Sequence, residues 1–168
     1  MTIASALAGA PGARVTAPAG GLLWAFHEGF AAYVSRLADG RVDVEGGARL
    51  LSDGRTFFPF GADPGGQGSS GQGSRGCGAL HFTGHHGLLA VTLAEPAIIT
   101  GAGTTVLTIT DPFSPGERLA FARLGEPASG RAACYTVPHL TEEGADFFLG
   151  HYREGTPLAP LEILPALA

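Results

Sequence analysis

The chain has 168 residues and a formal net charge of −5, and 45% of its residues are hydrophobic. The length fits a single domain, and the hydrophobic content is typical of a folded globular protein. All ten basic residues are Arg and the net charge is negative, which excludes the basic surface of a nucleic-acid-binding or anionic-membrane-binding protein. No apolar run approaches the roughly 18 to 20 residues of a membrane span.

The 27 Gly and 12 Pro residues show no Gly-X-Y period, so they indicate a turn-rich fold rather than collagen. Residues 1–19 lack the basic region and the sustained apolar region of a secretory signal, and we expect them to form a flexible leader. We therefore expect one domain over residues 20–168 and, without an export signal, a cytoplasmic location.

A helix is predicted between Gly20 and Asp39, where apolar residues recur at spacings of three and four. Gly40 follows as a typical residue after a helix C-terminus. The apolar residues of this predicted stripe are Leu23, Phe26, Phe30, Tyr33, Val34 and Leu37.

Short strands are predicted along most of the remaining chain. Residues 41–60 alternate Val with charged residues and contain a Ser-Asp-Gly turn signal, which predicts two strands joined by a hairpin. Residues 61–76 are rich in Gly and have no apolar residue larger than Ala, so we expect a flexible loop there. Further strands, about six to nine in total, are predicted within 78–84, 87–100, 104–113, 117–124 and 131–137.

The C-terminal region is predicted to form a short helix and a last strand. Thr141 precedes Glu142 and Glu143, a combination typical of a helix N-terminus, and we expect the helix to end near Gly155. The Pro-interrupted tail predicts an edge strand at residues 161–164. Together the elements indicate an α+β protein that is mostly β: an antiparallel β-sandwich or flattened barrel with an N-terminal amphipathic helix and a short C-terminal helix.

Three of the six His residues, His81, His85 and His86, lie close together in the sequence. They are either the polar tip of a hairpin turn over residues 84–87 or ligands of a divalent metal, because imidazole is the commonest metal ligand in proteins. The metal interpretation predicts a small β-barrel enzyme such as an oxygenase or isomerase. Cys77 and Cys134 lack CxxC spacing, which leaves either one disulfide or two buried thiols.

Tyr33 lies on the predicted apolar stripe, and two interpretations of it are open. A Tyr on an apolar helix face usually packs in the core, with its hydroxyl reaching a surface partner. Alternatively, a phenolate can bind ferric iron, as in proteins that hold haem through Tyr. Because a free phenol has a pKa of roughly 10, such a ligand needs stabilisation by the iron and by a His or Arg donor beside the oxygen.

Three segments stand out when they are taken in order: WAFHEGFAAYV at 24–34, FTGHHGLLAVTLAEPAI at 82–98 and LTEEGADFFLGHYREGTPLAPLEI at 140–163. They combine a Trp-led helix ending in Phe-x-x-Tyr-Val, a Phe-Thr-Gly-His-x-Gly hairpin leading to an acid-Pro pair, and a Leu-Thr-x-x-Gly helix ending in Tyr-x-x-Gly. This ordered set resembles the HtaA-type haem-binding domain of actinobacterial haem-uptake proteins. The resemblance covers about residues 22–164.

The resemblance implies a β-rich sandwich that captures, stores or transfers ferric haem b and is not an enzyme. In that family a Tyr from the first helix binds the iron, and a His hydrogen-bonded to the phenolate supports it. Carried over, Tyr33 is the axial ligand and His85 its hydrogen-bonding partner, with His86 as the second choice. Phe26 and Phe30 would line the haem slot. The resemblance also implies another haem-carrying protein as partner and, against the cytoplasm, a secreted or cell-surface location; it leaves the oligomeric state open.

Overall fold

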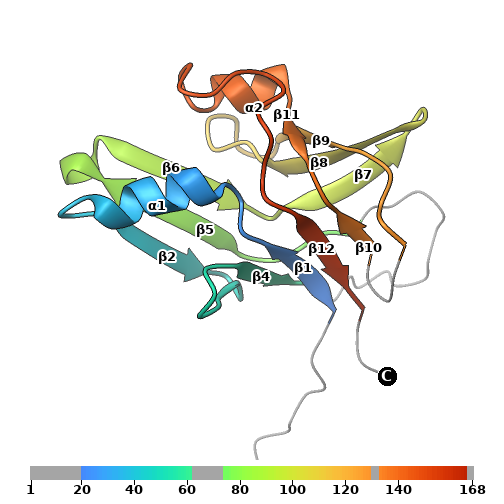
Figure 1. Cartoon of the computed structure of the whole chain (residues 1–168), viewed down its shortest axis with the longest axis horizontal. Helices are drawn as coiled ribbons and strands as arrows, with labels where there is room; N and C mark the ends of the chain where they lie inside the picture. The colour runs from blue at the N-terminus through green and yellow to red at the C-terminus, as the bar shows by residue number, and fades with distance from the viewer. Residues whose placement is uncertain (1–19, 62–73, 130–132, 166–168) are drawn as a thin grey trace, which may run out of the picture.

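A computed structural model describes residues 20–61, 74–129 and 133–165. These residues form three antiparallel β-sheets, two short α-helices and one 3-10 turn (Figure 1). The protein is therefore an α+β protein that is mostly β, with the sandwich-like antiparallel arrangement that the sequence predicts.

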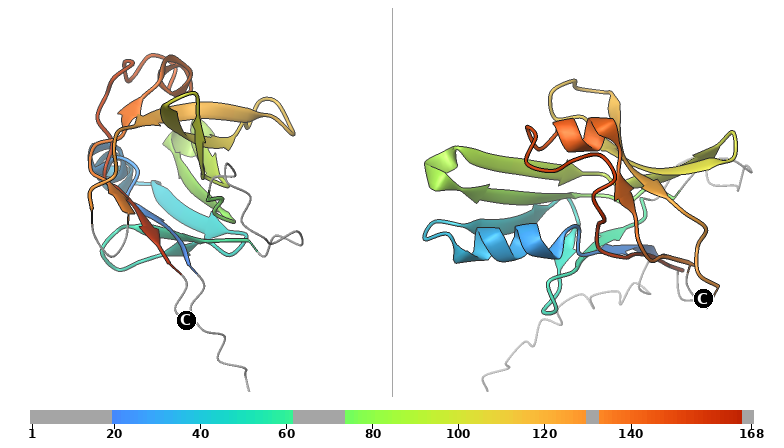
Figure 2. Two further views of the ribbon diagram at one scale, coloured as in Figure 1. Left: turned by 90° about the vertical axis from the view of Figure 1, so that its right-hand side faces the viewer. Right: turned by 45° about the horizontal axis from the view of Figure 1, so that its top comes forward.

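The three sheets surround one hydrophobic core at the centre of the domain. The five-stranded sheet has the order β10 (Ala133–Tyr135), β12 (Leu161–Leu164), β1 (Gly21–Trp24), β4 (Thr56–Pro59) and β3 (Arg49–Leu50). The three-stranded sheet consists of β2 (Arg41–Glu45), β5 (Ala79–Gly84) and β6 (Leu89–Ala94). The four-stranded sheet has the order β11 (His139–Leu140), β9 (Arg118–Leu124), β8 (Thr104–Thr110) and β7 (Ala97–Gly101). Figure 2 shows the β5–β6 hairpin and the β7–β8–β9 strands extending in opposite directions from this centre.

The structure divides the helix predicted over 20–39 into a strand and a shorter helix. All four residues of β1 are buried, because this strand lies between β12 and β4. Phe26 has a φ of 60°, which separates the strand from α1 (Glu28–Arg36). His27 then caps α1, and its Nδ1 accepts a hydrogen bond from an amide of the first turn at 3.0 Å. The apolar spacing continues across the strand and the turn, which is why the sequence predicted one helix.

The helix α1 packs on the three-stranded sheet, against β2 and β5 (Figure 1). Its buried side chains are Phe30 and Val34, four residues apart on one face. The ring centroid of Phe30 lies 5.1 Å from that of Phe82 on β5. These contacts fix the helix against the sheet and so fix the direction in which its other side chains point.

An aromatic cluster fills the core where the sheets meet. The ring centroid of Phe26 lies 5.6 Å from those of Trp24 and Phe148 and 6.0 Å from that of Phe121. The Trp24 indole Nε1 donates a hydrogen bond to the carbonyl of Ala159 at 3.1 Å, so its polar group is satisfied in the interior. Burying a large apolar side chain of this kind contributes about 2 to 3 kcal/mol. This cluster ties the segment before α1 to the C-terminal part of the chain.

The hairpin predicted over 41–60 forms only in its second half. β3 pairs with β4 across a turn in which the Leu51 amide donates to the Arg55 carbonyl at 2.8 Å. β2, by contrast, pairs with β5 in the three-stranded sheet. Val42 and Val44 of β2 therefore lie opposite Phe82 and Leu80 of β5 and pack against the core from that sheet.

Residues 62–73 of the predicted flexible loop lie outside the described residues. The end of the predicted loop is paired: Arg75 forms an isolated bridge with Ala97 of β7, and its guanidinium binds the carboxylate of Glu95. These contacts hold the chain just before it enters β5, and the flexible loop stays a prediction.

The C-terminal helix α2 (Glu142–Asp146) begins where the sequence predicted but is shorter. Thr141 caps it, with its Oγ1 accepting a hydrogen bond from a first-turn amide at 2.9 Å. The helix does not continue to Gly155, because Leu149 takes a left-handed φ of 52°. The last strand has the predicted bounds, but β12 lies between β10 and β1 and is not an edge strand.

Candidate functional site at Tyr33 and His85

Tyr33 combines contact with the core and access to solvent. With 3.6 residues per turn, it lies beside the buried stripe of Phe30 and Val34 on α1. Its ring centroid lies 6.5 Å from that of Phe30, yet the residue is 44% exposed. The ring is therefore held while the phenol oxygen stays accessible, and Tyr33 is not sealed in the core.

The Tyr33 oxygen contacts His85, which lies 52 residues further along the chain. Tyr33 Oη and His85 Nε2 are 2.5 Å apart. His85 is the first residue of η1 (His85–Gly87), the 3-10 turn that joins β5 to β6 beside α1 (Figure 1). The bond is compatible with two protonation states, because a phenol O–H can donate to a neutral Nε2 and an Nε2–H can donate to a phenolate.

The turn that carries His85 is held by the carboxylate of Asp39. Asp39 follows α1, and its Oδ1 and Oδ2 accept hydrogen bonds from the backbone amides of His85 at 3.1 Å and His86 at 2.6 Å. The bond from the His86 amide is the largest cause of a lowered pKa of Asp39. Sequence analysis missed this residue, because a single Asp after a helix carries no signal of a distant partner.

His86 points away from Tyr33. Its side chain is 95% exposed, and its Nδ1 lies 3.8 Å from a carboxylate oxygen of Asp39. Adjacent residues of a turn project in different directions, so only one of the two His side chains meets the phenol. The structure places His85, not His86, in that position, and a haem contact of His86 stays a prediction.

His81 is separated from the other two His residues by the geometry of β5. Side chains alternate across a strand, and the neighbouring Phe82 packs beneath α1, so His81 faces the other side of the sheet. Its Nδ1 shares a hydrogen bond with Thr92 Oγ1 at 3.0 Å, and its Nε2 lies 3.1 Å from a carboxylate oxygen of Glu45. Among the residues that the structure describes, no three His, Cys, Asp or Glu side chains form a group able to hold a metal ion. The predicted metalloenzyme site therefore lacks support.

The apolar residues predicted beside Tyr33 differ in their exposure. Phe26 is 1% exposed and belongs to the aromatic core, and Phe30 lies between that core and Tyr33. A haem contact of either ring stays a prediction. Sequence analysis did not single out Leu88, which directly follows η1 and is 92% exposed. Leu88 is thus a solvent-exposed apolar residue three positions after His85.

The acid-Pro pair of the second motif has a structural role. The Glu95 carboxylate accepts hydrogen bonds from the guanidinium of Arg75 and from Thr110 Oγ1, and its carbonyl accepts one from Arg118. The bond from Arg75 is the largest cause of a lowered pKa of Glu95. Glu95 thus joins the three-stranded sheet to the four-stranded sheet, away from Tyr33.

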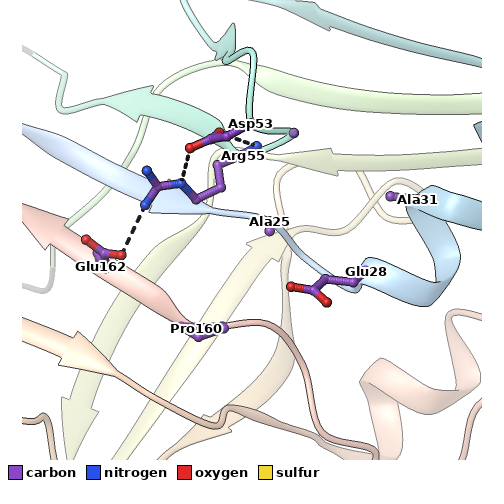
Figure 3. Close-up of a pocket in the computed structure, with 8 residues that line it drawn as sticks. Ala25, Glu28, Ala31, Asp53, Arg55, Pro160 and Glu162 are labelled. Carbon is purple, nitrogen blue, oxygen red and sulfur yellow. Dashed lines mark hydrogen bonds and ion pairs between the residues drawn. The ribbon is translucent and has the colours of Figure 1, made fainter.

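A pocket of about 440 Å³ lies on the other side of the α1 buried stripe from Tyr33. Figure 3 shows Arg55 between the carboxylates of Asp53 and Glu162. Arg55 Nε lies 2.8 Å from Asp53 Oδ2, and Arg55 Nη1 lies 3.1 Å from Glu162 Oε1. The lining residues are Ala25, Glu28, Ala31, Asp53, Gly54, Arg55, Pro160 and Glu162. Through these two ion pairs Arg55 bridges the β3–β4 turn and β12.

Both cysteines are free thiols and partly buried, so the disulfide alternative is not realised in the structure. Burial is the main cause of a raised pKa of the Cys134 thiol, which keeps it protonated at neutral pH. Neither cysteine belongs to the Tyr33 site.

Comparison with protein families agrees with the resemblance that the three ordered motifs indicate. The family model HtaA matches residues 19–164, a range that contains Tyr33, His85 and Asp39. The chain belongs to the HtaA family. None of the curated protein sequences compared with the chain matches it.

Three solved structures from Corynebacterium glutamicum are similar to this HtaA-family chain. The C-terminal domain of HtaA has a TM-score of 0.67 at 19% identity and covers 90% of this chain and 98% of that one. The N-terminal domain of HtaA has a TM-score of 0.67 at 21% identity, covering 90% and 99%. The haem-binding protein HtaB has a TM-score of 0.63 at 19% identity, covering 86% and 91%. At these identities the similarity shows a shared fold.

Neither helix in the described part of the HtaA-family domain has the length and apolar character needed to cross a membrane.

Proposed function

We propose that the protein is a non-enzymatic haem-binding protein that takes up ferric haem b, with Tyr33 as the axial ligand. The observation that carries the proposal is the accessible hydrogen bond between Tyr33 Oη and His85 Nε2. The family adds support, because the structural relative HtaB is described as haem-binding and has the same fold. His85 is proposed as the group that stabilises the Tyr33 phenolate.

The residues at the Tyr33 site suit haem better than a metal ion without a porphyrin. A porphyrin already fills the in-plane positions of its iron, so the protein has to add one accessible axial ligand and apolar surface. Tyr33 supplies a single accessible oxygen, whereas the described residues contain no group of three metal-ligating side chains. Leu88 and Leu149, which are 92% and 87% exposed, are proposed to add apolar contacts. Ferric haem, when bound, supplies the Lewis-acidic iron to which a phenolate oxygen binds.

His85 lies where its Nε2 can donate a hydrogen bond to the Tyr33 oxygen. When Tyr33 is anionic, an Nε2–H on His85 donates to the phenolate and stabilises its charge. Protonation of the Tyr33 oxygen removes the anionic ligand, so acid favours release. Reversible binding of this kind suits a protein that captures or stores haem and passes it to another haem-carrying protein.

Titration with hemin tests this function. We expect saturable binding at one hemin per chain, with the Soret and charge-transfer bands typical of an iron phenolate. The His85→Ala variant should bind more weakly by about tenfold or more, since supporting partners of metal ligands typically contribute that much. His81→Ala is the matched control, because His81 lies on the other face of β5 and should leave hemin binding unchanged. Absence of hemin binding, or equal losses in both variants, would contradict the proposal.

A further inference from the structure

We propose that Asp39 is a positioning residue of this site: its carboxylate holds the η1 turn in the one conformation that brings His85 to Tyr33. The part of this inference that concerns haem binding rests on the proposed function. The contact that it explains is the hydrogen bond between His85 and Tyr33.

The backbone of η1 needs an external partner. His85, His86 and Gly87 have φ values of 50°, 56° and 88°, so three consecutive residues lie in the left-handed region. Two of them carry side chains, for which this region is unfavourable. Consecutive amides in such a turn point to one side and form a small concave site for an anion. The Asp39 carboxylate occupies this concave site and accepts hydrogen bonds from its amides.

The position of Asp39 is fixed by close packing between the end of α1 and the end of β5. Gly84, the last residue of β5, approaches Leu37 so closely that a Cβ on it would lie 2.6 Å from Leu37 Cδ1. The same Cβ would lie 3.8 Å from the Cα of Gly40, the residue after Asp39. Gly84 thus allows the helix end and the strand end to touch, and Asp39 lies at this junction. Gly40 allows the tight turn after α1, since a Cβ there would meet the carbonyl oxygen of Val34.

Asp39 therefore connects the two halves of the site. Its own segment continues from the helix that carries Tyr33, and its side chain binds the turn that carries His85. Each carboxylate oxygen accepts from a different amide, with Oδ1 bound to His85 and Oδ2 to His86. An Asn at this position offers one acceptor oxygen, and its NH₂ group would face the second amide, which is also a donor.

The test compares Asp39→Asn, His85→Ala and the double variant, with Asp43→Asn as the matched control. Asp43 is an exposed Asp on the neighbouring strand β2 and accepts no bond from η1. The rate of hemin loss to excess apomyoglobin should rise about tenfold in Asp39→Asn and remain at the wild-type value in the control. The double variant should lose hemin no faster than His85→Ala, because Asp39 acts through His85. Additive losses in the double variant, or an unchanged rate in Asp39→Asn, would overturn the proposal.

A second measurement uses the protein without hemin. Hydrogen exchange of the His85 and His86 amides should accelerate at least about tenfold in Asp39→Asn, and the NMR signal of the His85 ring should move toward that of a free imidazole. Neither change is expected in Asp43→Asn. If wild-type protein fails to bind hemin, the proposed function is wrong, but these measurements still decide whether Asp39 sets the Tyr33–His85 contact.

If Asp39→Asn does not fold, Asp39→Glu replaces it in both measurements. The longer side chain keeps two acceptor oxygens, so it should retain part of the amide protection and lose hemin more slowly than Asp39→Ala. Equal behaviour of Asp39→Glu and Asp39→Ala in both measurements would also contradict a carboxylate that binds the turn.

Discussion

The side chains of Tyr33 and His85 meet at a hydrogen bond of 2.5 Å although one comes from a helix and the other from a hairpin turn. The packing of Phe30 against Phe82 places the helix on the sheet, and Asp39 fixes the turn at the far end of the same sheet. The site is thus assembled by tertiary contacts from two rigid pieces of the fold. Its geometry should persist in the haem-free protein.

Phe26 should matter for stability more than for haem binding. Phe26→Ala removes a ring that is 1% exposed and contacts several aromatic neighbours, so we expect it to lower the free energy of unfolding by about 3 to 5 kcal/mol. Urea denaturation of the haem-free protein measures this. Leu149→Ala serves as the control, since Leu149 is 87% exposed and should change stability by less than about 0.5 kcal/mol. A loss below about 1 kcal/mol in Phe26→Ala would show that Phe26 is not a core residue.

Thr141 should contribute stability through the start of α2. Its Oγ1 accepts from the Gly144 amide and donates to the Ala120 carbonyl of β9, and the residue is 8% exposed. Thr141→Ala should lower the free energy of unfolding by about 1 to 2 kcal/mol, the usual contribution of a helix N-cap. Thr104→Ala, at an exposed position of β8, is the comparison. Equal thermal midpoints for the two variants would be inconsistent with a capping role.

Glu95 should make stability depend on acid. Its pKa is lowered in the folded protein from the ordinary value of 4.5, with Arg75 as the main cause. The stabilisation is therefore complete above pH 4.5 and is lost as pH falls through the lower, folded-state pKa. Because both side chains are partly exposed, we expect Glu95→Gln to cost only about 0.5 to 1 kcal/mol at pH 7.

Chemical denaturation of wild type and Glu95→Gln between pH 7 and acid measures this effect. The difference between the two proteins should shrink as the pH falls from 4.5 through the lower, folded-state pKa of Glu95. Glu117→Gln, at an exposed position just before β9, is the matched variant with the same change of charge. A Glu95→Gln difference that grows toward acid would have the wrong sign for this carboxylate.

The predicted elements gave the fold class, whereas only the resemblance to the HtaA family paired Tyr33 with His85, two side chains that the structure brings into contact. Residue types alone left both residues with more than one interpretation. The choice between His85 and His86 depends on the left-handed backbone of η1, which two adjacent His residues do not reveal. Asp39 was missed for a similar reason, since its partners are amides that come close only because Gly84 lets the strand end touch the helix end.

The first helix shows where periodicity fails. β1 is buried on both faces and therefore has no polar alternation that would mark it as a strand. The apolar positions of β1 then joined those of α1 in one apparent stripe. Only the pairing of β1 with β4 and β12, which the sequence does not encode locally, separates the strand from the helix.

The most direct test of the account is the absorption spectrum of hemin-loaded Tyr33→Phe, beside Tyr135→Phe and Tyr152→Phe. All three variants remove one hydroxyl, but Tyr135 lies in β10 and the Tyr152 ring packs on Phe148, so neither contacts His85 in the structure. We predict that the phenolate charge-transfer band disappears only in Tyr33→Phe. A band that survives in Tyr33→Phe, or that is lost in either of the other two variants, would contradict Tyr33 as the ligand.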